Sequence, residues 1–298
     1  MTVSTQRVTA GSALRSRRRS TPLLGRVGLW YLVTSLVALL FLFPFIQVAL
    51  TSVKTPAEAV ASPPTYWPTQ ISFANFARLA DTGAGIGTYL INSLGVTLGC
   101  VVMTLVLTTL AGYGLSKLRF RGSNWVFLAL LAPMMVPNQA LLTPLYVILQ
   151  RLHLTNSLIG LACVYTVFLV PLGTFIMRNA FAGVPQELEE AAWIDGCGTL
   201  TAGLRISLPL SLPGFATVAL FAFFTAWNEF LSALVLLTSD EKFTVPLLLQ
   251  NLVAGKFGTI DWGMLQVGVL VTSLPCVVIF LLLQRYYVEG LLAGSVKS

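Results

Sequence analysis

The chain has 298 residues, of which 56% are hydrophobic and only 10% are charged. So much apolar surface exceeds what one soluble core can shield from water, and the composition therefore excludes an ordinary soluble domain. The 18 basic and 11 acidic residues leave a net charge of +7, but they stand between long uncharged stretches, so their placement matters more than their sum.

Six stretches with no charge, or with a single one, follow one another along the chain. Each is longer than the roughly 20 apolar residues that cross a hydrocarbon core of about 30 Å. One acid, Glu229, interrupts the fifth stretch. The sequence therefore predicts an all-α polytopic membrane protein with six transmembrane helices, at 28–50, 88–115, 125–148, 158–177, 211–237 and 263–284.

Lysine and arginine are shared unequally between the two sides of these predicted spans. Thirteen lie on the side of the N-terminus and five on the other side. The positive-inside rule makes the richer side cytoplasmic, and an even number of spans then places both termini in the cytoplasm. The predicted organisation is a basic cytoplasmic segment at 1–27, a six-span domain at 28–285 and a cytoplasmic tail at 286–298.

Residues suited to metal binding or bond-making chemistry are few. The four cysteines show no metal-ligand spacing, and the one histidine, His153, falls in a predicted external turn. No glycine-rich loop is followed by the lysine of a nucleotide-hydrolysing site. We therefore expect no catalytic residue, no metal and no cofactor in this chain.

Glycines and prolines within the predicted spans indicate close packing and bends. Gly95 and Gly99 lie one turn apart, a spacing that allows close helix contact either within the chain or in a dimer. Prolines such as Pro137 remove backbone hydrogen bonds, which neighbouring helices or a polar cavity must then replace.

The segment 178–209 is the longest predicted cytoplasmic stretch between spans. Pro185 suits the first turn of a helix, nearby acids complement the helix dipole, and Gly196 suits the left-handed residue that ends it. A second short helix is predicted from Leu200 to Leu208, ended by Pro209. On the first helix, Leu188, Ala191, Ala192 and Asp195 are predicted to share one face. That face indicates a docking surface, and an interfacial helix that covers the bundle is the alternative.

This segment resembles the EAA motif of ABC importer permeases, and we call residues 178–209 the EAA segment. The match consists of Glu190-Ala191-Ala192, three residues, Gly196, nine residues, Ile206, one residue and Leu208-Pro209. In that family the motif forms the coupling helix, which docks in a groove of the ATPase subunit. The resemblance therefore implies these ATPase-coupling residues: Glu190, Ala191, Ala192, Asp195, Gly196, Ile206, Leu208 and Pro209.

The resemblance extends over nearly the whole chain, to the smaller permease of maltose-type carbohydrate uptake systems. It is carried by Asn92-Ser93-Leu94, Ala111-Gly112-Tyr113, Trp227-Asn228-Glu229-Phe230 and the tail Gly290 to Lys297. It implies a type I ABC importer permease bundle in the bacterial inner membrane, which forms half of a translocation pathway with a second, homologous permease. Two ATP-binding cassette ATPase subunits, which bind the ATP, and an external solute-binding protein are the other implied partners.

The resemblance also implies the substrate class. A di- or oligosaccharide is expected, and a glycerol phosphate or glycerophosphodiester is the alternative. A substrate pathway is predicted around Glu229, because a charge near the centre of a span costs about 2.5–3.5 kcal/mol and so avoids lipid. The candidate pathway residues are Trp227, Asn228, Glu229, Asn92, Gln139 and Tyr146.

Other interpretations of Glu229 remain open. It could pair with another helix, order the interface with the second permease, or relay protons in a secondary carrier that runs without ATP. Such a carrier has no need of a docking segment with the EAA spacing. An intramembrane enzyme would need a nucleophile with its base or a metal cluster, and the sequence offers neither.

Overall fold

The computed structural model describes residues 23–118, 120–258 and 260–295, with the backbone alone for 23–27 and 285–295. The chain divides into two units, Met1–Ile46 and Gln47–Ser298. In the first unit the described residues belong to helix α1 (Leu23–Ser52), which is apolar from Gly28 onward. The predicted N-terminal segment 1–27 and the end of the predicted tail therefore lie largely outside the described residues.

All regular structure in the described part of the chain is helical. Besides α1, three helices are long and apolar enough to cross a membrane: α4 (Ile86–Lys117), α7 (Leu158–Ala182) and α14 (Trp262–Ser295). These four helices agree with the first, second, fourth and sixth predicted spans. Helix α14 runs on to Ser295, through most of the predicted tail.

The third and fifth predicted spans are broken. Helix α5 (Ser123–Leu131) passes into η1 (Ala132–Met135), and the chain then bends by 103° into α6 (Asn138–Arg151). The bend falls at Val136, which takes an extended conformation because a residue before proline avoids the helical region. The predicted span at 125–148 is therefore a bent pair of helices, with the bend next to Pro137, one of the prolines at which bends were expected.

The fifth predicted span ends early. Helix α11 (Leu212–Asn228) stops before Glu229, and the short helix α12 (Leu231–Leu236) begins after it. At its other end, α11 is bent by 79° from the stretch Thr199–Leu210 that precedes it. Counting each bent pair as one span gives up to six spans, in agreement with the predicted number.

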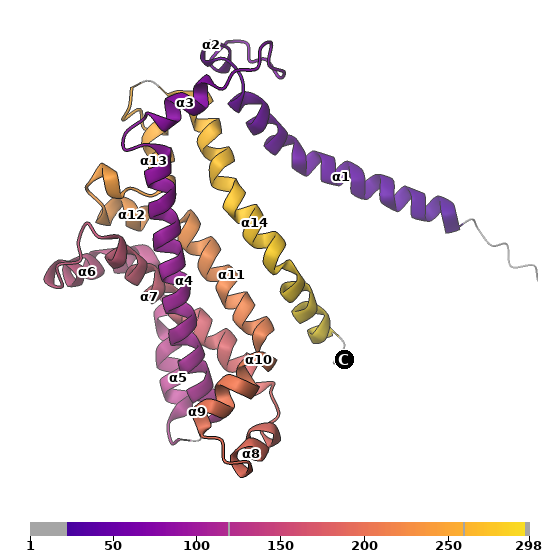
Figure 1. Cartoon of the computed structure of the whole chain (residues 1–298), viewed down its shortest axis with the longest axis vertical. Coiled ribbons are helices and arrows are strands. Elements are labelled where there is room, and N and C mark those ends of the chain that lie inside the picture. Colours follow the sequence, from indigo (N-terminus) through magenta and orange to yellow (C-terminus); the bar gives the residue numbers. More distant parts are fainter. Residues whose placement is uncertain (1–22, 119, 259, 296–298) are drawn as a thin grey trace, which may run out of the picture. The chain divides into compact units, whose positions relative to one another are not determined.

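Within Gln47–Ser298, two groups of short helices lie toward the two ends of the long ones (Figure 1). One end carries α8 (Glu187–Ile194), α9 (Thr199–Ala202), the π-helical turn η2 (Gly203–Ser207) and α10 (Leu208–Leu210). Toward the other end lie α2 (Pro56–Ala59), α3 (Ala74–Ala80), η3 (Asp240–Lys242) and α13 (Val245–Val253). The EAA segment is thus separated from the loops that are predicted to be external.

Helix α4 forms the centre of this unit, because it packs along α7 and also contacts α11, which in turn packs on α14. Helix α4 comes close to α7 at Gly112, where a Cβ would lie 2.6 Å from the Cβ of Met177. By contrast, no atom lies within 4 Å of the corresponding position at Gly95. Close packing within the chain therefore occurs at Gly112, near the EAA segment, and not at the Gly95 position.

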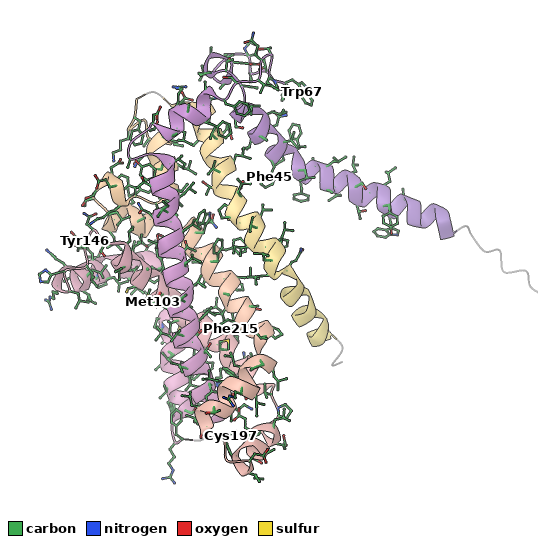
Figure 2. All side chains as sticks on the ribbon, in the orientation of Figure 1. Phe45, Trp67, Met103, Tyr146, Cys197 and Phe215 are labelled. Carbon is green, nitrogen blue, oxygen red and sulfur yellow. The ribbon has the colours of Figure 1, made fainter. Side chains whose placement is uncertain are left out.

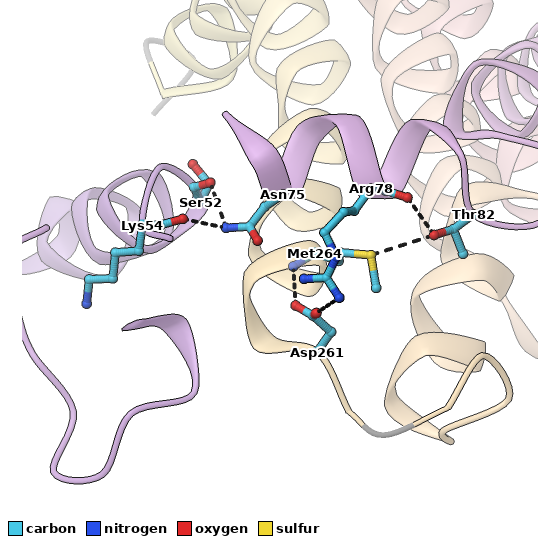
Figure 3. Close-up of polar contacts among 7 residues, drawn as sticks. All are labelled: Ser52, Lys54, Asn75, Arg78, Thr82, Asp261 and Met264. Carbon is cyan, nitrogen blue, oxygen red and sulfur yellow. Dashed lines mark hydrogen bonds and ion pairs between the residues drawn. The ribbon is translucent and has the colours of Figure 1, made fainter. Parts of the chain in front are cut away.

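Polar contacts fasten the opposite end of the unit (Figure 3). The buried amide of Asn75 on α3 donates hydrogen bonds to the carbonyls of Ser52, at 3.3 Å, and Lys54, at 2.8 Å. Arg78 pairs with Asp261, which precedes α14. Helix α3 therefore joins the chain that follows α1 to the start of α14.

Candidate functional site

Helix α8 of the EAA segment begins at Glu187, with Gln186 as its N-cap residue and Pro185 just before it. Glu187, Glu189 and Glu190 lie in the first turn, where negative charge complements the helix dipole. The helix ends at Ile194, and Gly196 has a φ of +86°, the left-handed conformation that follows many helices. The predicted role of Gly196 as a helix-ending residue is confirmed.

The inner face of α8 is anchored by a buried carboxylate. Glu189 is only 1% exposed and accepts a hydrogen bond from the hydroxyl of Ser207. The Tyr113 hydroxyl lies 3.4 Å from the same carboxylate and 3.0 Å from the Thr199 carbonyl oxygen. Because this hydroxyl has one proton, it donates to one of these acceptors at a time, and the Thr199 contact is the shorter.

The end of α4 holds the EAA segment at two further points. Lys117 donates a hydrogen bond to the carbonyl of Val184, 2.6 Å away and just before α8. At Gly203, a Cβ would lie 2.8 Å from the ring of Tyr113, so the glycine is needed for this close approach. The Ala111-Gly112-Tyr113 motif therefore lies where α4 supports the EAA segment.

The outer face of α8 has apolar side chains with no cover in the described chain. Ile194 is 87% exposed, and Leu188, Ala191, Trp193 and Asp195 are also exposed. Ala192 is buried against its own chain, so the prediction that it shares this outer face is wrong. The reason is helical spacing, since Ala192 follows Glu189 by three residues and shares its inward direction. Glu190 is exposed and accepts a hydrogen bond from Gln186.

The second half of the EAA segment differs from the prediction of one helix ended by Pro209. The chain forms α9, the wider π-helical turn η2 and then α10, which contains Pro209 near its start. Proline is tolerated there because the first residues of a helix need no intrahelical N–H partner. Leu208 packs against the cluster around Tyr113 and Phe181, Ile206 is half-buried, and Pro209 is exposed.

A second polar region surrounds the break between α11 and α12. Glu229 has an extended backbone, with φ −74° and ψ 128°, and does not sit within one unbroken helix as predicted. Its carboxylate oxygens lie 2.9 and 3.1 Å from the N–H of Ser232, which donates to them at the start of α12. The Tyr165 hydroxyl donates to the Glu229 carbonyl oxygen over 3.3 Å. A side chain from α7 and a backbone N–H from α12 thus hold the break.

Glu229 and Gln139 line the same cavity of about 150 Å³. The other lining residues are Asn138, Leu142, Tyr165, Phe168, Thr225, Leu231 and Ser232. The structure therefore brings together two of the six candidate pathway residues. Asn138 and Thr225 were not among the candidates, although the position of Asn138 directly after Pro137 is a signal in the sequence.

The remaining candidate pathway residues lie elsewhere. Trp227 is 1% exposed, stacks on Phe223 and donates a hydrogen bond to the Thr272 carbonyl, 3.1 Å away on α14. Asn92 donates to the carbonyls of Glu241 and Phe243, and so ties α4 to the chain before α13.

Asn228 and Tyr146 are both exposed. The amide of Asn228 donates to the Phe224 carbonyl one turn earlier. Tyr146 lies on α6, well apart in space from Cys197 at the EAA end (Figure 2). Neither residue lines the cavity at Glu229.

Residues 105–291 match the family model described as the binding-protein-dependent transport system inner membrane component. The chain is 34% identical to the diacetylchitobiose uptake system permease protein DasC of Streptomyces coelicolor, over 93% of this chain and 99% of DasC. It is also 34% identical to the arabinooligosaccharides transport system permease protein AraQ of Bacillus subtilis, over 88% of this chain and 93% of AraQ.

The fold resembles one chain of a solved structure, that of a bacterial ABC transporter involved in the import of the acidic polysaccharide alginate. The TM-score is 0.76 with 23% sequence identity, and the similarity covers 90% of this chain and 98% of that chain. At this level of identity the likeness concerns the fold.

Proposed function

The chain belongs to the family of binding-protein-dependent transport system inner membrane components, and on this premise we propose that it is the smaller permease of an ATP-driven carbohydrate importer. Its relatives DasC and AraQ are named for the uptake of a disaccharide and of oligosaccharides. A di- or oligosaccharide is accordingly the proposed substrate. The chain contributes half of the pathway and performs no bond-making step.

The exposed outer face of α8 carries the proposal of ATPase coupling. This outer face carries exposed apolar side chains, Ile194 above all, while Glu189 fixes the opposite, inner face of the same helix to the rest of the chain. A fixed support with an uncovered apolar surface suits docking of a protein partner, because movement of the partner is then transmitted to α4. The proposed occupant is the ATPase subunit, which binds the ATP, with one such subunit for each of two permeases.

A substitution on the outer face tests this proposal. Ile194→Arg places a charge at the proposed interface and should reduce copurification of the ATPase with the permease by tenfold or more, on the scale of hot-spot losses of about 2 kcal/mol. Ile71→Arg, at an isoleucine that is 74% exposed near the other end of the unit, is the matched control and should copurify normally. Normal copurification of the ATPase with Ile194→Arg would show that the outer face of α8 is not part of the interface.

The proposed orientation places the EAA segment in the cytoplasm. A cysteine introduced at the exposed Glu241 should react with an impermeant thiol reagent added to intact cells, and so should one at Ser72. The native Cys197, half-buried beside α8, should react only after the membrane is opened. Labelling of Cys197 from outside would reverse the orientation.

A further inference from the structure

The cavity at Glu229 lies where two broken helices meet. Asn138 and Gln139 open α6 directly after the 103° bend, and Glu229 lies between α11 and α12. Helix α7 supplies the wall between them with Tyr165 and Phe168. Broken helices expose polar backbone and side-chain groups at membrane depth only where these groups face protein or a water-filled cavity.

A second cavity of about 280 Å³ continues from the first, since both are lined by Asn138, Phe168 and Thr225. Its other walls are apolar: Pro133, Met134, Leu141, Val167, Leu169, Pro171 and Leu172. Together the two cavities fall in the lower part of the roughly 300–1,000 Å³ range that is typical of small-molecule sites. We call them the Glu229 groove, which has a polar end and an apolar end.

The charged side chains that line the groove are of one sign, negative. Among the described residues that line it, Glu229 is the sole carboxylate, and lysine, arginine and histidine are absent. The remaining polar groups at its polar end include the exposed amides of Asn138 and Gln139 and the exposed hydroxyl of Thr225. The Ser232 N–H fixes the carboxylate but leaves further lone pairs on both oxygens as acceptors.

We propose that the Glu229 groove is a sugar subsite that accepts neutral and amino sugars and rejects acidic ones. Neutral hydroxyls can donate to the carboxylate and exchange hydrogen bonds with the amides, and an ammonium group adds charge attraction. An acidic sugar would bring a like charge to Glu229 in a region of low dielectric where no basic lining residue compensates for it. This inference rests on the proposed function and specifies the substrate class.

Thiol chemistry tests the charge of the groove. Thr225→Cys is prepared in the full-length chain with its four native cysteines replaced by alanine, purified in detergent, and treated with a cationic and an anionic methanethiosulfonate. The rate with the cationic reagent divided by the rate with the anionic reagent should be about fivefold or more higher at Thr225→Cys than at Gln150→Cys, an exposed reference position. The reason is that Glu229 attracts the cation. Adding Glu229→Gln should bring the ratio to the reference value, whereas Glu229→Asp, which keeps the charge, should not.

Sugar protection tests the ligand. Glucose, glucosamine and glucuronate, which share a ring and differ in charge, are each added before the neutral reagent N-ethylmaleimide. Glucose and glucosamine should slow the labelling of Thr225→Cys, and glucuronate at equal concentration should not. Equal protection by glucuronate overturns the charge selection, and absence of protection by all three overturns the subsite. Neither result touches the ATPase interface, which the copurification of Ile194→Arg tests separately.

Discussion

The Ser207 hydroxyl donates a hydrogen bond to the buried carboxylate of Glu189, which lies 18 residues earlier in the chain. This contact joins the first helix of the EAA segment to its second half. Tyr113 from α4 lies against the same carboxylate, so the two halves and the end of a long helix meet at one point. A force applied to α8 would therefore reach α4 through a small set of polar contacts.

Ser207→Ala should loosen the EAA segment without affecting insertion. The change leaves a buried carboxylate that retains only the longer Tyr113 contact, at a cost of about 2 kcal/mol. Amides of residues 184–207 should then exchange with deuterium about 30-fold faster, since 1.4 kcal/mol corresponds to a factor of ten. Thr199→Ala is the control, because only the Thr199 carbonyl contacts Tyr113. Unchanged exchange in Ser207→Ala would show that the contact does not hold the segment.

Gly203→Ala should destabilise the same region for a steric reason. Its Cβ would lie 2.8 Å from the Tyr113 ring, and overpacking of this kind costs about 1–3 kcal/mol. The expected result is a lower apparent Tm of the purified chain in detergent. Gly198→Ala, whose Cβ would meet no atom within 4 Å, should leave the Tm unchanged. Equal Tm values for the two variants would contradict the close approach of Tyr113.

The stability of the loop after α2 should depend on pH, because it involves the carboxylate of Glu58. Its carboxylate accepts hydrogen bonds from the Thr69 N–H, at 2.9 Å, and from the hydroxyls of Thr65 and Thr69. These bonds, the backbone N–H of Thr69 foremost, hold the pKa of Glu58 below its ordinary value of 4.5. Stabilisation of the loop is therefore complete above that value and is lost as the pH falls through the lowered pKa.

Deuterium exchange of residues 55–69 in wild type and in Glu58→Gln, compared at each pH, measures this effect. The variant cannot titrate at this position, and the comparison cancels the intrinsic pH dependence of exchange. Wild type should be better protected at pH 7, and its advantage should shrink below about pH 4. A constant advantage across this range would mean that the carboxylate does not fasten the loop.

The long helices could be predicted because membrane insertion depends on local composition. Helices α4 and α7 coincide with uncharged stretches of sufficient length. Gly196 was also predictable, since a left-handed residue after a helix has a strong preference for glycine. The bend before α6 has its cause in Pro137, but the 103° angle depends on packing that the sequence does not display.

No proline or glycine lies next to the break at Glu229, so the usual sequence signals for the end of a helix are missing there. Asn228 and Glu229 are polar, but two polar residues in an apolar stretch do not by themselves predict a break. The chain leaves the helix where the Glu229 carboxylate accepts a hydrogen bond from the Ser232 N–H. The direction of Trp227 likewise depends on α14, whose Thr272 carbonyl accepts from its indole. Both features depend on contacts between particular residues, which a hydropathy pattern does not show. The pathway and coupling roles of the named residues stay predictions.

Gly196→Val should uncouple ATP hydrolysis from transport. At Gly196 a Cβ would meet no atom within 4 Å, so the cost of a side chain there comes from the backbone, with φ at +86°. Left-handed backbone costs an ordinary residue about 1–2 kcal/mol, and a β-branched side chain resists it further. The turn after α8 should therefore change its path and displace the outer face from its partner.

The measurement is the stimulation of ATP hydrolysis by substrate-loaded binding protein in the reconstituted complex. Stimulation should fall severalfold in Gly196→Val and be largely kept in Gly196→Asn, because asparagine tolerates the left-handed region. Gly198→Val is the matched control, since Gly198 is extended, with φ −72° and ψ 157°, and has open space around it. β-branched residues favour that conformation, so full stimulation is expected there. Full stimulation and normal uptake in Gly196→Val would show that transport does not depend on the left-handed turn after α8.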